Sequence, residues 1–201
     1  MSTFVYTGSG SDATVGHGLS SAPEVVLIKT SSHTSNWPVY HKDLTNASYR
    51  LVFDENLAEN TDNNPWNSTA PSSSVISIKG DAGNVNQSGR SFICWAMHSV
   101  DKFSKFGSYT GTGSALSVTG VGFSPNFLII KDTDSTEQWY MFDTTRGASK
   151  FLHCNINNAE GTDSTSRLTS FDADGFSLGT DGAVNGSSHK YIYMAWNDNG
   201  D

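Results

Sequence analysis

The chain has 201 residues, of which 36% are hydrophobic and 11% aromatic, so it can bury a core and is not a disordered segment. Its formal net charge is −8, which repels phosphate backbones and excludes nucleic acid as an expected partner. No apolar run approaches the ~20 residues that span a bilayer, so we expect no membrane insertion.

The first half of the chain is predicted to consist of short strands joined by polar turns. Its N-terminus lacks the basic and apolar regions of a Sec signal peptide, so we expect export by another route or an excised fragment. The unbroken apolar run Val25-Val-Leu-Ile28 fits a central strand that is buried on both faces. In the strand expected at 92–97, Cys94 should be a buried free thiol and Trp95 a core residue.

The second half is predicted to hold eight strands and no helix. They span residues 106–110, 116–119, 126–131, 138–144, 150–155, 168–172, 175–178 and 190–196. Asp174-Gly175 is a strong hairpin signal and predicts a turn there. The last strand alternates aromatic and aliphatic residues, as sandwich strands do, so Trp196 is expected in the core. Cys154 should be a second buried free thiol, because free cysteine behaves as a small hydrophobe.

Six short blocks of the first half recur in the same order in the second half, at a period of roughly 100 residues, the size of one small domain. The paired blocks are residues 4–10 and 107–113, 18–29 and 122–131, 37–41 and 139–143, 56–59 and 157–160, 83–88 and 182–187, and 92–97 and 191–196. We therefore predict an all-β protein with two domains, 1–100 and 101–201. Each is expected to be a jelly-roll-like β-sandwich, and the two to be related by internal duplication.

The sequence shows no catalytic set and no metal motif. A glycosidase needs two carboxyl groups, and the equivalent Glu59 and Glu160 supply one per copy. No Gly-x-Ser-x-Gly elbow is present, and no histidine recurs at an equivalent position. The segments 132–135 and 172–175 are faintly similar to calcium loops but lack the liganding glutamate, and both fit turns. We therefore expect no enzyme activity, no cofactor and no metal.

The tryptophans are the candidate ligand-binding residues. Trp37 and Trp139 are equivalent and each opens a strand after a polar loop, while Trp66 stands in an irregular segment. Exposed aromatic rings stack on sugars or anchor protein interfaces. The alternative is that these three side chains pack under loops.

Several blocks resemble a repeat domain that is common in structural proteins of tailed phages, especially marine and cyanobacterial ones, where it stands beside lectin-like domains. The blocks are residues 109–113, 122–131, 142–147, 168–179 and 184–187. The resemblance covers nearly the whole chain. The first copy lacks the Asp-Thr-Thr-Arg-Gly and Phe-Asp-Ala-Asp-Gly-Phe segments of the second. The resemblance implies a virion location and supplies no catalytic residues.

The leading hypothesis from the sequence is a tail, fibre or capsid-decoration component on the surface of a phage particle, with possible adhesion to a host-surface glycan. Other virion proteins and a homo-oligomer, such as a trimer, are the expected partners. One alternative is a decoration protein without a ligand. Another is a calcium-dependent lectin or a glycosidase of concanavalin-like fold.

Overall fold

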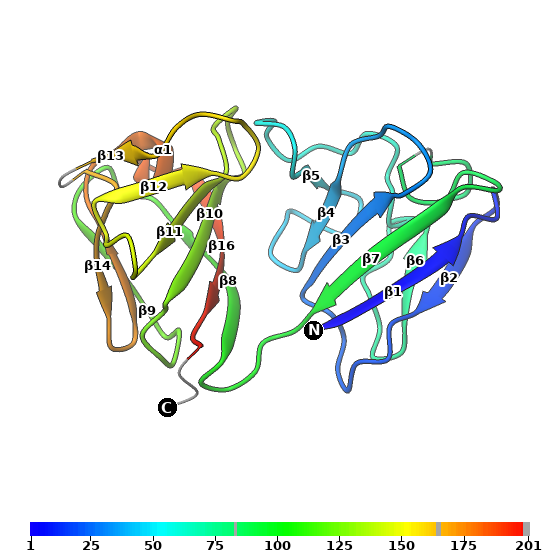
Figure 1. The fold of residues 1–201 in the computed structure, drawn as a ribbon, viewed down its shortest axis with the longest axis horizontal. Coiled ribbons are helices and arrows are strands. Elements are labelled where there is room, and N and C mark those ends of the chain that lie inside the picture. The colour runs from blue at the N-terminus through cyan, green and yellow to red at the C-terminus, as the bar shows by residue number, and fades with distance from the viewer. Residues whose placement is uncertain (83, 164–165, 199–201) are drawn as a thin grey trace. The chain divides into compact units, whose positions relative to one another are not determined.

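The computed structural model describes residues 1–82, 84–163 and 166–198, which form two compact units (Figure 1). Unit 1 contains Met1–Asp54 and Glu59–His98, and unit 2 contains Glu55–Ala58 and the chain from Ser99 on. Gly83, which belongs to the fifth repeated block, lies outside the described residues.

Unit 1 is a sandwich of two antiparallel sheets. Its strands are β1 (Ser2–Thr7), β2 (Ala13–Gly16), β3 (Val25–Thr30), β4 (Pro38–His41), β5 (Leu51–Val52), β6 (Val75–Ile78) and β7 (Ser91–Met97). The larger sheet has the order β1-β7-β3-β4-β5, and the smaller sheet pairs β2 with β6. Side chains from both sheets meet in one core, which includes Ile28, Ile76 and Phe92.

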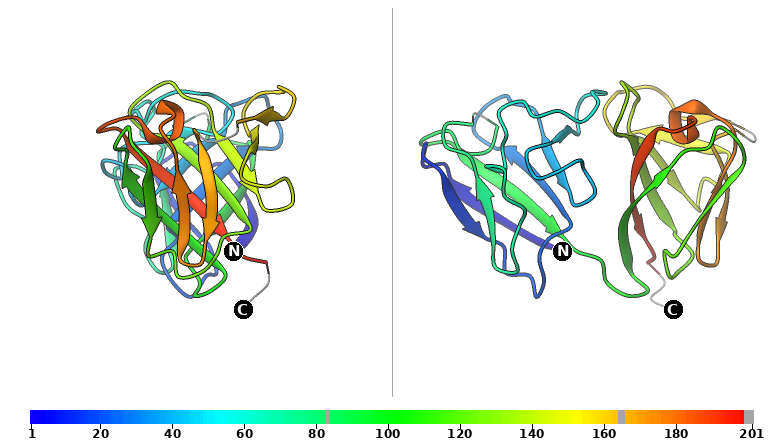
Figure 2. Two further views of the ribbon diagram at one scale, coloured as in Figure 1. Left: turned by 90° about the vertical axis from the view of Figure 1, so that its left-hand side faces the viewer. Right: turned by 180° about the vertical axis from the view of Figure 1, so that it is seen from behind.

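Unit 2 has the same two-layer construction with more strands. They are β8 (Ser104–Thr110), β9 (Leu116–Thr119), β10 (Phe127–Asp132), β11 (Tyr140–Asp143), β12 (Lys150–His153), β13 (Gly161–Thr162), β14 (Leu168–Asp172), β15 (Gly175–Leu178) and β16 (Lys190–Trp196). The larger sheet has the order β13-β12-β11-β10-β16-β8, and the smaller one β14-β15-β9. Leu128, Phe142 and Phe176 belong to the core between them. The helix α1 (Gly182–Asn185) lies at the end of this unit where β16 begins (Figure 2).

The prediction of all-β sandwich units is confirmed, with two local corrections in unit 2. The one-turn helix α1 is too short to produce a helical period, so no sequence pattern indicates it. The hairpin turn is formed by Ala173 and Asp174, because Asp172 pairs with Gly175. Gly175 already belongs to β15, and a Cβ there would collide with the carbonyl oxygen of Val118 on β9. Close approach of that strand and a φ of +146°, not a place in the turn, require this glycine.

The recurring Tyr-Thr-Gly segment makes the same contacts in both units. Tyr6 stacks on Phe92 with ring centroids 5.2 Å apart, and Tyr109 stacks on Tyr191 at 5.1 Å. In each case the two stacked residues are direct cross-strand partners, on β1 and β7 or on β8 and β16. The strand orders β1-β7-β3-β4-β5 and β8-β16-β10-β11-β12 also correspond. These matches support a common plan, while descent from one duplicated unit stays a prediction.

Both cysteines are free thiols. Cys94 is buried in the core of unit 1, and Cys154 is partly buried just after β12. Burial raises the pKa of each thiol to about 12, because a thiolate would lose its hydration there. Neither thiol is therefore set up as a nucleophile at neutral pH.

Candidate functional site

The three tryptophans that the sequence predicts as ligand-binding residues differ in their exposure. Trp66 and Trp139 are both 0% exposed, so neither offers a ring face to a ligand. Trp37 is partly buried and stacks on Trp95, with ring centroids 5.6 Å apart and planes 14° apart. The ammonium group of Lys29 lies 5.8 Å from the Trp37 ring centroid. The burial favours the packing interpretation, and a binding role for these residues stays untested.

The expectation that Trp95 and Trp196 are core residues is wrong. Successive side chains of a strand point to opposite faces of the sheet. On β7, Cys94 and Ala96 belong to the core, so Trp95 between them points to the other face. On β16, Ala195 belongs to the core, so Trp196 also points away from it.

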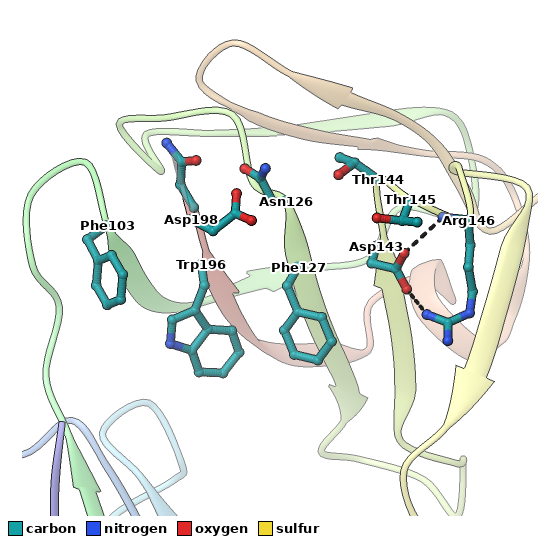
Figure 3. Close-up of a pocket in the computed structure, with 10 residues that line it drawn as sticks. Phe103, Asn126, Phe127, Asp143, Thr144, Thr145, Arg146, Trp196 and Asp198 are labelled. Carbon is teal, nitrogen blue, oxygen red and sulfur yellow. Dashed lines mark hydrogen bonds and ion pairs between the residues drawn. The ribbon is translucent and has the colours of Figure 1, made fainter. Parts of the chain in front are cut away.

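Trp196 lines a pocket of about 600 Å³ in unit 2. The pocket lies where β16 ends, β10 begins and β11 ends, because Phe127 pairs with Trp196 on one side and with Asp143 on the other. Its lining residues are Phe103, Asn126, Phe127, Asp143, Thr144, Thr145, Arg146, Trp196, Asn197 and Asp198 (Figure 3). This volume is in the range of small-molecule binding sites.

Aromatic rings line one side of the pocket. Phe127 and Trp196 are cross-strand neighbours with ring centroids 5.6 Å apart. Fully buried Phe106 supports the Trp196 ring edge-on at 5.5 Å. Phe103, in the turn before β8, is 48% exposed. Figure 3 shows the rings of Phe103, Trp196 and Phe127 in a row.

Arg146 is held in place beside the carboxylate of Asp143. The backbone N–H of Arg146 donates to Asp143 Oδ1 at 2.9 Å, and its guanidinium donates to Asp143 Oδ2. Arg146 Nε also lies 3.3 Å from Glu160 Oε2. Two carboxylates therefore already engage the guanidinium. Because Arg146 is 40% exposed, these ion pairs position the side chain more than they stabilise the fold.

Four polar side chains of the pocket have no hydrogen bond or ion pair within the described chain: Asn126, Thr144, Thr145 and Asp198. The backbone around them is nonetheless fixed. Asn126 N–H donates to Trp196 O at 2.8 Å, and Thr144 N–H donates to Asn126 O at 3.0 Å. The pocket thus combines an apolar side with polar side chains whose backbone is fixed and whose hydrogen-bonding groups are available to a ligand.

Unit 1 does not carry this pocket chemistry at the equivalent positions. The correspondence follows from the shared register, since Val25 pairs with both His41 and Met97 as Phe127 does with Asp143 and Trp196. Glu24, Val25, His41, Leu44 and Met97 stand in unit 1 where Asn126, Phe127, Asp143, Arg146 and Trp196 stand in unit 2. The candidate site therefore belongs to unit 2 alone.

Sequence reasoning missed Phe103, Phe127 and Arg146 as site residues. One signal was present, because the segment 143–147, Asp-Thr-Thr-Arg-Gly, occurs only in the second copy. A segment that one copy has and the other lacks indicates function better than a shared segment, which the common fold already explains. Phe127 carried no comparable signal, since aromatic strand residues are common in cores.

A protein family described as Domain of unknown function (DUF7483) matches residues 1–199. The chain belongs to this family. The DUF7483 match runs across both units. Searches of curated proteins and of solved structures each find no match. Within the described part of this DUF7483 chain, no helix is long and apolar enough to cross a membrane.

A serine, a histidine and an aspartate meet at the end of β10 without forming a catalytic triad. Fully buried Asp132 lies 2.8 Å from His189 Nδ1 and accepts a hydrogen bond from Ser135 Oγ at 2.8 Å. It also accepts from the backbone N–H of Asp134 at 2.8 Å. In a triad the serine hydroxyl binds the histidine, whereas here both groups bind the carboxylate. Asp132 therefore braces the loop after β10.

We expect the brace to make stability depend on pH. The hydrogen bond to Asp132, and then that carboxylate's charge, raise the pKa of His189 above its ordinary value of 6.5, with smaller contributions from Asp134 and Glu137. Since the folded-state pKa is the higher one, this stability is present below pH 6.5 and is lost as the pH rises through the raised pKa. With His189 43% exposed, solvent screening keeps the effect small.

The measurement is urea unfolding of the chain and of His189→Gln at about pH 5.5 and about pH 9. The stability difference between the two proteins should be larger at the lower pH. An equal difference at both values would contradict the ion-pair explanation.

The two segments that are faintly similar to calcium loops use their carboxylates internally. Asp172 accepts hydrogen bonds from Ser170 Oγ and Ser177 Oγ, both at 2.6 Å. Asp174 accepts from the backbone N–H of Gly120 at 3.0 Å and of Gly122 at 2.7 Å, which lowers its pKa. Among the residues that the structure describes, no group of three or more His, Cys, Asp or Glu side chains is placed to hold a metal ion.

Proposed function

We propose that this chain is a non-catalytic carbohydrate-binding component on the surface of a phage particle. The pocket of unit 2 carries the binding half of the proposal. Aromatic side chains form one side of it, and polar groups without internal partners form the other. Sugar rings need this combination, because their C–H faces pack on aromatic rings while their hydroxyl groups need donors and acceptors. The resemblance of the repeated blocks to phage structural proteins supports the virion location.

The arrangement of the carboxylates favours binding without hydrolysis. A glycosidase uses one carboxyl group as acid and a second as nucleophile or base. In the pocket, Asp143 is engaged by Arg146, which leaves Asp198 as the pocket carboxylate without a described partner. One carboxylate of this kind supplies acceptors for sugar hydroxyls but does not make an acid–base pair.

The charges of the pocket favour a neutral sugar. Arg146 is engaged by Asp143 and Glu160, so it is not available for a sugar carboxylate. The unpartnered charge is the carboxylate of Asp198, which repels anions. Uronic and sialic acids should therefore bind less well than neutral hexoses.

The test is a glycan array of bacterial surface oligosaccharides, followed by calorimetric titration with neutral tetrasaccharides of glucose, mannose and N-acetylglucosamine. Sialyllactose and trigalacturonate are the acidic comparison. Trp196→Ala should weaken binding at least about tenfold, as truncation of a central aromatic anchor does. Met97→Ala, the equivalent change in unit 1, should leave binding unchanged.

Phe103→Ala tests the same aromatic side at a residue exposed enough that its loss should not unfold the unit. It should also weaken binding, with an unchanged melting temperature. If no glycan binds in the array or in the titrations, while the chain binds tightly to purified particles, the glycan proposal is overturned in favour of a decoration protein without a ligand. Release of shortened sugars would overturn the proposal of a non-catalytic role.

A further inference from the structure

A second hollow of about 590 Å³ adjoins the pocket in unit 2. The two hollows share Asn126, Thr144 and Asn197 in their linings. The second one extends over the loop before β10 to the β14–β15 turn. Its other lining residues are Lys102, Gly122, Phe123, Ser124, Pro125 and Ala173.

We propose that the two hollows are successive subsites for one linear oligosaccharide of at least two sugar residues, an inference that rests on the proposed function. Asn126 and Thr144, at the shared wall, have side chains that both donate and accept hydrogen bonds. Neither side chain has a hydrogen-bond partner within the described chain. The hydrogen bond from Thr144 N–H to Asn126 O, at 3.0 Å, keeps the two residues together. They are placed to bind the hydroxyl groups on either side of one glycosidic bond.

The two subsites differ in what they offer a sugar. The first contains the rings of Phe103, Phe127 and Trp196, which supply stacking. In the second, Phe123 is buried and contributes to the core, while the exposed lining is formed by Lys102 and by small side chains such as Ser124 and Ala173. The second subsite therefore offers hydrogen bonds and shape without a stacking platform. It should add affinity to a chain that is anchored in the first subsite and should not hold a sugar alone.

The experiment compares the mono-, di- and tetrasaccharide of the neutral sugar that binds in the array, by calorimetric titration. The tetrasaccharide should bind the intact chain at least about tenfold more tightly than the monosaccharide. Ala173→Trp places a large side chain in the second hollow from an exposed turn position. It should remove most of the gain with chain length and leave monosaccharide affinity unchanged within about twofold.

Ser73→Trp is the matched control, because Ser73 is the exposed unit-1 residue three positions before Ile76 in β6, as Ala173 is three positions before Phe176 in β15. It should behave as the intact chain does. Equal affinity for monosaccharide and tetrasaccharide, or full tetrasaccharide affinity in Ala173→Trp, would overturn the two-subsite inference while the proposed function stands. Failure of every fragment to bind would overturn the proposed function itself.

Discussion

Trp66→Ala is expected to destabilise unit 1 by about 3–5 kcal/mol, the range for removing a large aromatic side chain from a core. The Trp66 side chain is 0% exposed and belongs to the core cluster of unit 1. Its ring meets that of Tyr40 edge-on, with centroids 5.8 Å apart. Trp66 anchors the polar segment between β5 and β6. Alanine would leave a cavity and also release that segment.

Urea unfolding followed by circular dichroism measures the effect, with Trp66→Phe as the control. Phenylalanine should cost less, because it keeps part of the ring volume and removes an indole N–H that is buried without a partner. The opposite pattern, unchanged stability together with lost glycan binding, would make Trp66 a ligand-binding residue as the sequence nominated it.

Asn185→Ala is expected to lower the free energy of unfolding of unit 2 by about 2–4 kcal/mol. Asn185 is 0% exposed, and its side chain binds three backbone groups. Oδ1 accepts from Thr112 N–H at 2.8 Å, and Nδ2 donates to Ser114 O at 2.6 Å and Gly179 O at 2.5 Å. Each buried polar group left without a partner costs about 1–3 kcal/mol. Water can reach the exposed residues Thr112 and Ser114, which keeps the total below the sum.

Asn86→Ala is the matched change in unit 1, with an expected cost of about 1–3 kcal/mol. Asn86 is also 0% exposed, accepts from Ser9 N–H at 2.8 Å and donates to Ser11 O at 2.7 Å. It thus binds two backbone groups where Asn185 binds three. The two asparagines close the same loop in the two units.

Native-state hydrogen exchange measures the two units separately, through peptides from β7 and β16. Asn185→Ala should accelerate exchange in β16, and Asn86→Ala in β7. Asn157→Ala, at an exposed position of unit 2, should change stability by less than about 0.5 kcal/mol. If both core variants lost protection in the same unit, the two asparagines would not be equivalent.

Strand positions were predictable where a local pattern was complete. The strands β9, β14, β15 and β16 begin and end where the sequence places them. The segment expected at 138–144 is shorter in the structure, where β11 spans Tyr140–Asp143. The two-residue strand β13 was not predicted, because two residues carry no alternation. Strand ends depend on where the partner strand ends, which the sequence of one strand does not contain.

The candidate site shows the limit of the same reasoning. Tryptophan content pointed to Trp37, Trp66 and Trp139, yet the structure buries the last two completely. Conversely, the place of Trp196 in an apolar strand predicts a core residue, whereas the structure turns its side chain to the opposite face. The two-residue period of a strand sets which side chains share a face, and only the register with neighbouring strands shows which face is the core.

Local patterns of apolar residues and turn formers were sufficient to specify an all-β sandwich with a repeated plan, because strands and turns depend on residues close together in the chain. The pocket depends on residues from four separate segments, among them Phe103, Phe127, Asp143 and Trp196. Their meeting was decided by antiparallel register across β16, β10 and β11. No short-range pattern encodes such a meeting, so only the tertiary structure shows that aromatic rings lie opposite unpaired polar groups in unit 2.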